Sequence, residues 1–533
     1  MRVQATPLHL TLWPRTDFPP LLDEAAERLS ARVLARLDNF GAMREPCHSR
    51  VLESALALRL LERFDEADES RRRLRDYLRT HHDSDDSLDR LLVEVALRQP
   101  GDTAMSQANF DEFVARAPAF TAARKQMLID AVLVLFDVPP SAQYDLAEVA
   151  TIGLHSWAAV QVTALKVILA AATGRRDLIR TGDVALLLST QREPGIWEAN
   201  VLIHLSVLHA LALLPDTEEV IAAGIGKLLT ELRSDGGLPF ISDTDTWCSA
   251  TAGVALSAIG APRDRLLPLA QHLAAQQLPN GGWSFTDGVL QSDVDDTSVA
   301  IEFLHSVDAE TYRTEIRQGM RSLLSVRGAD GGFPTYVAGS PSEACMTAAA
   351  VNALSTQPAN HRDAMDSGLT FLAAQQHSDG SFAPDWSASR FHTLFRVMLA
   401  CGQLRADSPS SHHHMAAGAL RAIRSGQNSD GGWGQQPGDP SDALSTSYAL
   451  IALSGQEDHR AVIRGVDYLM SNQLEDGGIS TVPDSIGPRP FIFTIPLLAD
   501  TFALMAFGHL FNRLEPAGVG PDLRSVVENV GQL

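Results

Sequence analysis

The chain has 533 residues, of which 45% are hydrophobic and 20% charged, and its formal net charge is −22. This length predicts two large domains, and the composition is typical of a folded globular protein. The 43 basic residues form no stripe among 65 acidic ones, so nucleic acid is excluded as a partner. A small anionic substrate stays possible, because a few local basic groups can bind it.

The cysteines are isolated from one another in the sequence. Cys47, Cys248, Cys345 and Cys401 form no CxxC pair, which argues against a zinc cage or a disulfide framework and fits a reducing cytosol. The N-terminus has no apolar signal-peptide segment, and the sequence contains no run of 18 apolar residues. We therefore expect a cytoplasmic protein without a membrane span, either a monomer or a homodimer.

The N-terminal half carries helical periodicity with few strand signals. The apolar pattern predicts helices over residues 21–38, 48–64, 86–98, 109–136, 145–173 and 181–215. The charged stretches Asp65–Arg73 and His81–Asp89 are expected to lie at the solvated surface. Leu214-Pro215-Asp216 breaks the last of these helices, so we place a domain boundary near residues 215–230.

Glycine turns then recur at a nearly constant interval. They begin at Asp235, Asn280, Asp330, Asp379, Asp430 and Asp476, with gaps of 45, 50, 49, 51 and 46 residues. Each lies between two apolar-periodic segments, and a glutamine often precedes the turn by three residues, as at Gln277, Gln376, Gln427 and Gln473. Helical pairs that bury a face only against their neighbours must stack or close into a ring. The repeats predict an all-α fold of αα-barrels, with an open helical solenoid as the alternative.

The most acidic motif of the repeat region is Asp293-Val294-Asp295-Asp296, which opens an apolar helix. One interpretation is helix capping, since carboxylates are favoured at a helix N-terminus. The other is a strong Brønsted acid, because crowded carboxyl groups cannot all ionise and one of them keeps its proton. Such an acid can protonate an isolated alkene in a dry cavity, where aromatic faces stabilise the resulting carbocation. Aromatic candidates for these walls and for substrate contact are Trp247, Trp283, Phe285, Phe333 and Trp386.

The sequence around this motif resembles a known enzyme family. Gly281-Gly-Trp-Ser-Phe285 followed by Ser292-Asp-Val-Asp-Asp-Thr297 is similar to the catalytic segment of squalene–hopene cyclases and of class II diterpene cyclases of the copalyl diphosphate synthase type. The glutamine-containing turns look like the QW repeats of that superfamily. The resemblance implies a β domain of residues 1–30 and 225–533 and an inserted γ domain of residues 31–224, with the active site between them. It also implies that Asp295 is the proton donor, tuned by Asp293 and Asp296.

The resemblance favours a prenyl diphosphate as the substrate. Squalene–hopene cyclases carry a histidine that supports the acid, and the corresponding stretch here, from Pro341 to Ala349, has none. The first choice is therefore geranylgeranyl diphosphate, cyclised to a bicyclic copalyl-type diphosphate. Farnesyl diphosphate, giving a drimenyl-type product, is the main alternative, and a squalene-type triterpene cyclase is a further one.

A diphosphate substrate implies Mg²⁺ as cofactor and a few basic groups. The candidate Mg²⁺ ligands are Glu53, Asp89, Glu94, Glu193 and Glu198, while Arg390 and His392 are candidates for substrate contact, His392 also as a final base. Asp85-Asp86-Ser-Leu-Asp89 spells the DDxxD motif of ionisation-initiated terpene synthases, but its second metal motif does not follow.

Two other functional classes fit a helical barrel. The β subunits of protein prenyltransferases hold zinc with Asp, Cys and His, and no cysteine in this sequence has such ligands as sequence neighbours. A non-catalytic binding protein is the other alternative, and the intact DxDD motif argues against it.

Overall fold

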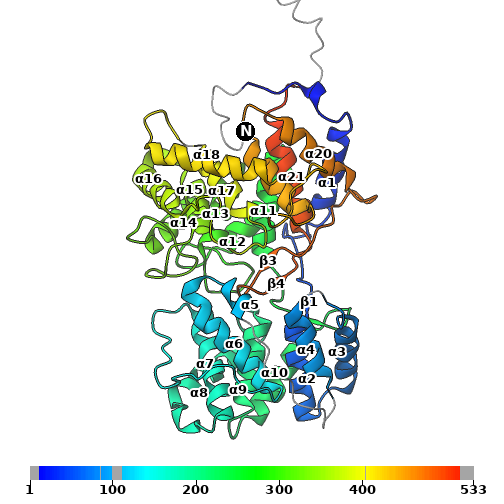
Figure 1. The fold of residues 1–533 in the computed structure, drawn as a ribbon, viewed down its shortest axis with the longest axis vertical. Helices are drawn as coiled ribbons and strands as arrows, with labels where there is room; N and C mark the ends of the chain where they lie inside the picture. The colour runs from blue at the N-terminus through cyan, green and yellow to red at the C-terminus, as the bar shows by residue number, and fades with distance from the viewer. Residues whose placement is uncertain (1–10, 85, 99–110, 403, 517–533) are drawn as a thin grey trace, which may run out of the picture.

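The computed structural model describes residues 11–84, 86–98, 111–402 and 404–516. These residues form two helical lobes, one above the other, joined by short segments at the middle of the molecule (Figure 1). Two pairs of very short strands are the only sheets in this described part of the chain. The prediction of an all-α fold is confirmed.

The upper lobe is a closed αα-barrel. Six inner helices contact one another in sequence, and the last returns to the first. In ring order they are α11 (Asp245–Ala258), α13 (Val294–Asp308), α15 (Ala344–Leu354), α17 (Phe391–Cys401), α19 (Ala443–Leu453) and α21 (Leu498–Phe511). The outer helices are α1 (Leu22–Leu34), α12 (Arg263–Ala275), α14 (Arg313–Val326), α16 (Pro358–Gln375), α18 (Ser410–Ser425) and α20 (Arg460–Ser471).

The inner and the outer ring of helices differ in composition because their helices bury different amounts of surface. Every residue of α19 is buried, which its alanine, leucine and small hydroxyl side chains allow. On α14 only Ile316, Gly319, Met320 and Leu323 are buried, which is the stripe of a helix with one apolar face. The inner helices therefore form the core, and the outer helices cover it.

Each glycine turn follows an outer helix in the chain, leads to the next inner helix, and contacts the following outer helix. In the turn at Asn280, the Gln277 amide donates to the carbonyls of Gly281 and of Glu315 in α14. Gly281 has a φ of +88°, and an added Cβ would lie 2.5 Å from the carbonyl oxygen of Gln318. The turns near Gln376, Gln427 and Gln473 repeat the glutamine contacts.

The N-terminal helix completes this ring of contacts. Gln473 donates to the carbonyl of Ala25 in α1, and Gly41, in the turn after α1, lies against the backbone of Pro268 in α12. The barrel therefore depends on residues from both ends of the chain.

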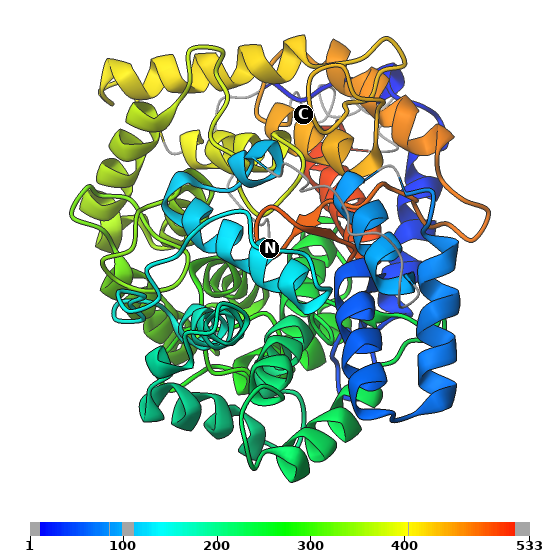
Figure 2. The ribbon, with the colours of Figure 1, turned by 60° about the horizontal axis from the view of Figure 1, so that its bottom comes forward.

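The lower lobe is built around a second core. Its central helices are neighbours in the order α4 (Ser87–Leu97), α2 (Val51–Phe64), α9 (Val201–Leu211), α7 (Ser156–Ala172) and α6 (Ala122–Leu135). Packed around them are α3 (Asp68–Thr80), α5 (Asp111–Ala115), α8 (Thr181–Ser189) and α10 (Glu218–Leu229). Figure 2 brings this lobe, coloured from blue to green, toward the viewer.

The 3₁₀ turns of the described residues are η1 (Arg15–Asp17), η2 (Ala119–Thr121), η3 (Arg176–Leu178), η4 (Thr190–Arg192) and η5 (Trp197–Ala199).

Several predicted helices of the N-terminal half differ from the observed ones. The helix predicted over 109–136 is interrupted at Pro118, and the one predicted over 145–173 begins only at Ser156. The helix predicted over 181–215 is broken by the turn after Arg192. The charged stretch that begins at Asp65 leads into α3. Leu74, Tyr77 and Leu78 of α3 are buried, but the many arginines of this helix conceal its apolar face in the sequence.

The chain crosses between the cores twice. The first core contains residues 13–47 and 241–514, and the second contains residues 51–238 together with Val289 and Phe491. At the crossings β1 (Ser49–Arg50) pairs antiparallel with β2 (Leu238–Pro239). The other pair, β3 (Ser485–Ile486) with β4 (Ile492–Phe493), is a hairpin of the upper lobe. The predicted domain boundaries, at residues 30/31 and 224/225, lie upstream of these crossings.

Within the described ranges, no helix combines the length and the apolar character that crossing a membrane requires.

We expect Gly281→Ala to destabilise the upper lobe more than Gly288→Ala does. Both glycines have a positive φ, which costs an alanine about 1–2 kcal/mol, but only Gly281 also lies against a neighbouring backbone. Thermal unfolding of the two variants measures the difference. Equal losses of Tm would show that the close approach of the turn to α14 adds nothing to stability.

Candidate active site

A cavity of about 490 Å³ lies between the two cores. From the lower lobe it is lined by residues of α6, α7 and α9, and from the upper lobe by the first turns of the inner helices. The β3–β4 hairpin forms another part of its wall. A cavity of this size and position is typical of a small-molecule site.

The acidic motif opens α13 at this cavity. Asp293 is the N-cap residue, and its Oδ1 accepts a hydrogen bond of 2.8 Å from the backbone amide of Asp296. Burial raises the pKa of Asp293 to about 6, and burial together with the adjacent Asp293 raises the pKa of Asp296 well above its usual range. Burial and the closeness of the two carboxyl groups favour one of them keeping its proton. The capping interpretation and the acid interpretation of the motif are therefore compatible.

Asp295 forms an ion pair with Arg396 of α17. Arg396 Nη1 lies 2.5 Å from Asp295 Oδ1, and the side chains are only 4% and 16% exposed. Asp295 also lines the cavity, and its Oδ2 has no hydrogen-bond partner among the described residues. The guanidinium stabilises a carboxylate at this position, while Oδ2 can carry a proton toward the cavity. Arg396 thus takes the supporting role that a histidine has in squalene–hopene cyclases. In the sequence, Arg396 is marked only by being an arginine within an apolar helix.

A further, half-buried carboxyl group lines a small cavity together with Arg396. Glu302 is seven residues after Asp295 on α13, and it lines a second cavity of about 50 Å³ together with Arg396. Burial raises the pKa of Glu302 to about 7. The sequence analysis did not identify Glu302, because a single glutamate in a helix carries no signal.

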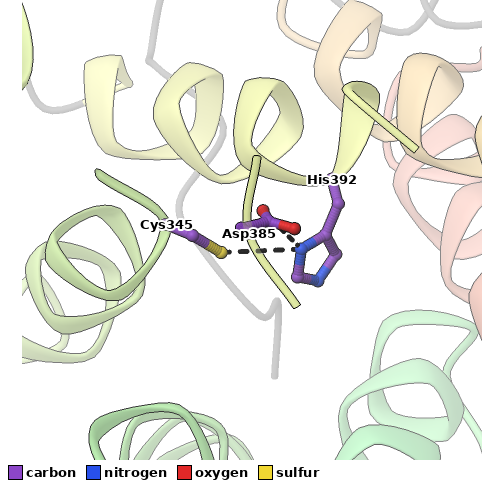
Figure 3. Close-up of side chains that lie close together, drawn as sticks. All are labelled: Cys345, Asp385 and His392. Atoms are coloured by element: carbon purple, nitrogen blue, oxygen red, sulfur yellow. Dashed lines mark hydrogen bonds and ion pairs between the residues drawn. The ribbon is translucent and has the colours of Figure 1, made fainter. Parts of the chain in front are cut away.

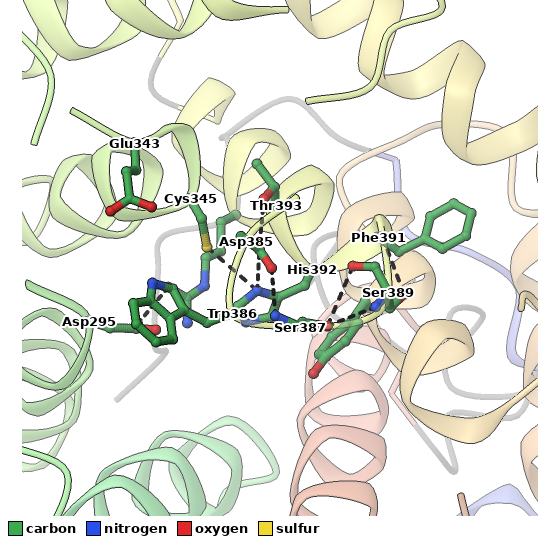
Figure 4. A network of polar contacts seen from close by, with 12 residues as sticks. Asp295, Glu343, Cys345, Asp385, Trp386, Ser387, Ser389, Phe391, His392 and Thr393 are labelled. Atoms are coloured by element: carbon green, nitrogen blue, oxygen red, sulfur yellow. Dashed lines mark hydrogen bonds and ion pairs between the residues drawn. The ribbon is translucent and has the colours of Figure 1, made fainter. Parts of the chain in front are cut away.

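His392, Asp385 and Cys345 meet beside the cavity (Figure 3). His392 Nδ1 lies 3.0 Å from Asp385 Oδ2 and 3.5 Å from Cys345 Sγ. Burial alone would raise the pKa of Asp385, but His392, the Thr393 hydroxyl and the Ser387 amide lower it to about 2. Figure 4 shows the hydrogen bonds that continue from Asp385 through Ser387 to Ser389.

This cluster corrects one conclusion drawn from the sequence. Cys345 does have an aspartate and a histidine beside it, although neither is its neighbour in the sequence. The three ligand atoms lie within 4.8 Å of one another, so they form the one group of potential metal ligands among the described residues. Asp385 already accepts hydrogen bonds at both of its oxygens, from Ser387 at Oδ1 and from His392 and Thr393 at Oδ2. This arrangement is that of a hydrogen-bonded carboxylate–imidazole pair.

Aromatic rings cover much of the cavity wall. Phe285 and Tyr336 lie edge-on to Trp157, with centroid distances of 5.4 and 5.3 Å, and Tyr336 is edge-on to Trp386 at 5.9 Å. Trp247 and Phe502 line the same space. Such faces attract a cation without offering it a nucleophile. Trp157 and Tyr336 were not predicted, because they lie outside the repeat segments that carried the resemblance.

Basic groups gather in another part of the cavity wall. Arg124 and Lys125 of α6 and Arg489 of the β3–β4 hairpin all line it. Burial, Arg489 and Arg124 lower the pKa of Lys125 to about 7, and Lys125 has no ion-pair partner within the described ranges. Arg489 is paired with Glu343 and lies over the Trp386 ring. A lysine whose pKa is lowered by neighbouring arginines is suited to binding an anion.

The predicted substrate contacts divide into two groups. Trp247, Phe285, Trp386 and His392 line the cavity. Trp283, Phe333 and Arg390 do not, and we remove them from the candidates. Trp283 is fully buried in the barrel wall, where its Nε1 donates to the carbonyl of Leu273, and Phe333 is also fully buried there. Arg390 lies 3.4 Å from Asp379 in a glycine turn.

The predicted Mg²⁺ ligands do not come together in the described part of the chain. Glu53 is completely buried and paired with Arg50, and Glu198 accepts hydrogen bonds from Trp157 Nε1 and the Leu290 amide. Asp89, Glu94 and Glu193 lie on the lower lobe without a shared centre. These five carboxylates do not fit a protein-held Mg²⁺. In the DDxxD sequence, Asp86 caps α4, and Asp85 lies outside the described residues.

Comparisons with known proteins agree with this geometry. Residues 339–512 match the family model of the squalene–hopene cyclase C-terminal domain. The chain is 38% identical over 521 residues to a drimenyl diphosphate synthase of Streptantibioticus cattleyicolor, covering 93% of this chain and 95% of that protein. It is 36% identical over 513 residues to a drimenyl diphosphate synthase of Streptomyces showdoensis, with 92% and 95% covered. The solved ent-copalyl diphosphate synthase of Streptomyces platensis shares the fold, with a TM-score of 0.58 and 17% identity over 92% of this chain and 100% of that one.

We expect Arg396→Gln to destabilise the protein by about 3–5 kcal/mol, because it leaves the Asp295 carboxylate buried without its partner. The double variant Asp295→Asn with Arg396→Gln is expected to be more stable than Arg396→Gln alone. Chemical and thermal unfolding measure both changes. Arg313→Gln, which breaks an exposed pair with Glu310, is the control and costs at most about 1 kcal/mol. An equal cost for the two arginine variants would contradict the proposed pairing.

Proposed function

Because this chain belongs to the class II terpene cyclase family, we propose that it cyclises farnesyl diphosphate to a drimenyl-type diphosphate. Two relatives that align with more than nine-tenths of the chain carry the name drimenyl diphosphate synthase. They favour the alternative of the sequence analysis over its first choice, geranylgeranyl diphosphate.

The observation that carries this proposal is that one cavity holds both an acid and a cluster of cations. Asp295 lines it from α13, and Lys125 and Arg489 line it from α6 and the β3–β4 hairpin. An ionic head group bound by the cations leaves the hydrocarbon tail among the aromatic rings, with its terminal alkene free to reach Asp295. The protein therefore favours protonation at the tail over loss of the diphosphate.

The reaction conserves all atoms of the substrate. Asp295 Oδ2 transfers its proton to the terminal carbon–carbon double bond, and the remaining carboxylate is stabilised by Arg396. The carbocation is then attacked in turn by the next two double bonds of the chain, which forms two carbon–carbon bonds and two rings. Asp293 and Asp296 hold the N-terminus of α13 in place and keep a proton beside the acid. The aromatic walls stabilise the positive charge and exclude water until a proton is lost.

Mg²⁺ is proposed as a companion of the diphosphate. Mg²⁺ prefers oxygen ligands and commonly uses substrate phosphates with few protein carboxylates. This mode agrees with the scattered positions of Glu53, Asp89, Glu94, Glu193 and Glu198 and with the cations at the cavity.

Purified protein with Mg²⁺ is expected to convert farnesyl diphosphate to a bicyclic diphosphate, detected as its alcohol after phosphatase treatment, and to convert geranylgeranyl diphosphate more slowly. Asp295→Asn should lower the rate at least about 100-fold at a temperature well below its Tm, because it removes the acid, and Tm itself should fall because Arg396 loses its ion-pair partner. Asp458→Asn, at an exposed ion pair, is the control.

Three results would contradict this assignment. Turnover of geranylgeranyl diphosphate but not of farnesyl diphosphate would show that the longer diphosphate is the substrate. Full turnover by Asp295→Asn would exclude the acid, and binding without turnover by the wild type would favour a non-catalytic protein.

The KM for the diphosphate is expected to rise with pH above about 7, by up to about tenfold per pH unit. Lys125, whose pKa is lowered to about 7, loses its charge in this range and must be protonated again to bind an anion. Lys125→Arg keeps its charge, so its KM should change less between pH 6.5 and 8.5. The substrate titrates equally in both assays, so the difference between the pH profiles of the wild type and of Lys125→Arg isolates the effect of Lys125. Parallel profiles would exclude Lys125 as a diphosphate ligand.

A further inference from the structure

Two carboxyl groups and two imidazoles line the cavity without a part in acid or diphosphate chemistry: Glu343, Asp484, His155 and His392. A cascade that begins with proton transfer from Asp295 must end when the last carbocation loses a proton or captures water. A group that accepts this proton needs a free lone pair facing the cavity. We examine the four groups for that property.

His392 has such a lone pair. Its Nδ1 donates to Asp385, whose pKa of about 2 keeps the carboxylate ionised at neutral pH. The proton of the neutral ring is thereby held at Nδ1, and Nε2 is left as an acceptor. Among the described residues Nε2 has no hydrogen-bond partner, whereas Nδ1 also lies 3.5 Å from Cys345 Sγ, and the ring lines the cavity.

We propose that His392 is the base that ends the cyclisation, with Asp385 as its positioning residue; this rests on the proposed function. A C–H bond next to the final cationic carbon breaks, and its electron pair forms the ring alkene. The proton goes to His392 Nε2, and the resulting imidazolium stays paired with Asp385. Asp295 has lost one proton and His392 has gained one, so exchange with solvent restores both groups without any co-reactant.

The position of His392 fits the place where the rings form. His392 and Arg396 are four residues apart on α17, so their side chains lie on the same face of that helix. Arg396 holds Asp295, and the terminal alkene must lie at Asp295. The bicyclic cation therefore forms near the acid, and His392 lies one helical turn from the arginine that holds that acid.

Asp385 is fixed so that it can orient the ring. Its Oδ1 accepts a hydrogen bond of 2.7 Å from the Ser387 amide, and its Oδ2 accepts from the Thr393 hydroxyl as well as from His392. A carboxylate held in this way fixes both the orientation and the tautomer of an imidazole.

The other three groups lack these properties. Asp484 accepts hydrogen bonds from Ser387, Ser389 and Tyr448, which occupy its oxygens. Glu343 is held by Arg489 and by the Thr335 hydroxyl. His155 stacks on Tyr336, and burial with Arg124 and Lys125 lowers its pKa to about 3, so it is a poor base.

The test measures products from His392→Ala, Asp385→Asn and a matched control, Cys345→Ala, in water enriched in ¹⁸O. Cys345 touches the same imidazole but does not line the cavity. His392→Ala is expected to form the wild-type alkene at least about tenfold more slowly, with a larger share of ¹⁸O-labelled alcohol or of isomeric alkenes. Added imidazole should restore the alkene in His392→Ala, and Asp385→Asn should show the same shift without rescue. Cys345→Ala should keep the wild-type products.

Three outcomes would overturn the proposal. The first is a wild-type rate and product pattern in His392→Ala. The second is a loss of activity in His392→Ala that follows its loss of Tm and does not respond to imidazole. The third is one zinc ion per wild-type chain that is lost in Cys345→Ala together with activity, which would make the cluster a metal site. A wild type that cyclises neither diphosphate would instead remove the proposed function itself.

Discussion

The ion pair between Asp295 and Arg396 joins the acid to the barrel that surrounds it. An arginine keeps its charge at any pH that the protein meets, so the carboxylate left after proton transfer always has a partner. The pair uses only one oxygen of Asp295 and leaves the other toward the cavity. A buried pair of this kind adds little stability by itself, but the loss of either member is costly. The interaction therefore fixes where the acid is and how it is charged.

That pair can form only in a closed ring. Asp295 is on α13 and Arg396 is on α17, with α15 between them, so the inner helices must keep their curvature for the two side chains to meet. The glycine turns maintain this geometry, and α1 completes it from the other end of the chain. The inner helices all begin at the cavity, so their N-termini favour the carboxylates gathered there. Aromatic rings from both lobes then offset the unfavourable effect of those positive helix ends on a carbocation.

The sequence predicts the features that depend on local pattern. The phased turns indicate the helical barrel, and the DxDD motif indicates the acid, because both have a fixed spacing in the chain. Arg396 has no such spacing, and only the ring brings it near Asp295, whereas Glu302 lies seven residues after Asp295 on the same helix. The same reason explains Cys345, which comes from a different segment than Asp385 and His392. Trp283 and Phe333 were misjudged because an aromatic residue in a glycine turn can point into the barrel wall as well as into the cavity. The basic cluster was missed because Arg489 is far in the sequence from the adjacent Arg124 and Lys125.

The central claim is that a proton from the enzyme starts the reaction and that the diphosphate is retained. Incubation of the protein with farnesyl diphosphate in D₂O tests it directly, by mass spectrometry of the product and by assay of released inorganic diphosphate. We predict one deuterium at the ring carbon derived from the terminal alkene, and no release of diphosphate. Release of diphosphate with an unlabelled hydrocarbon would contradict the account.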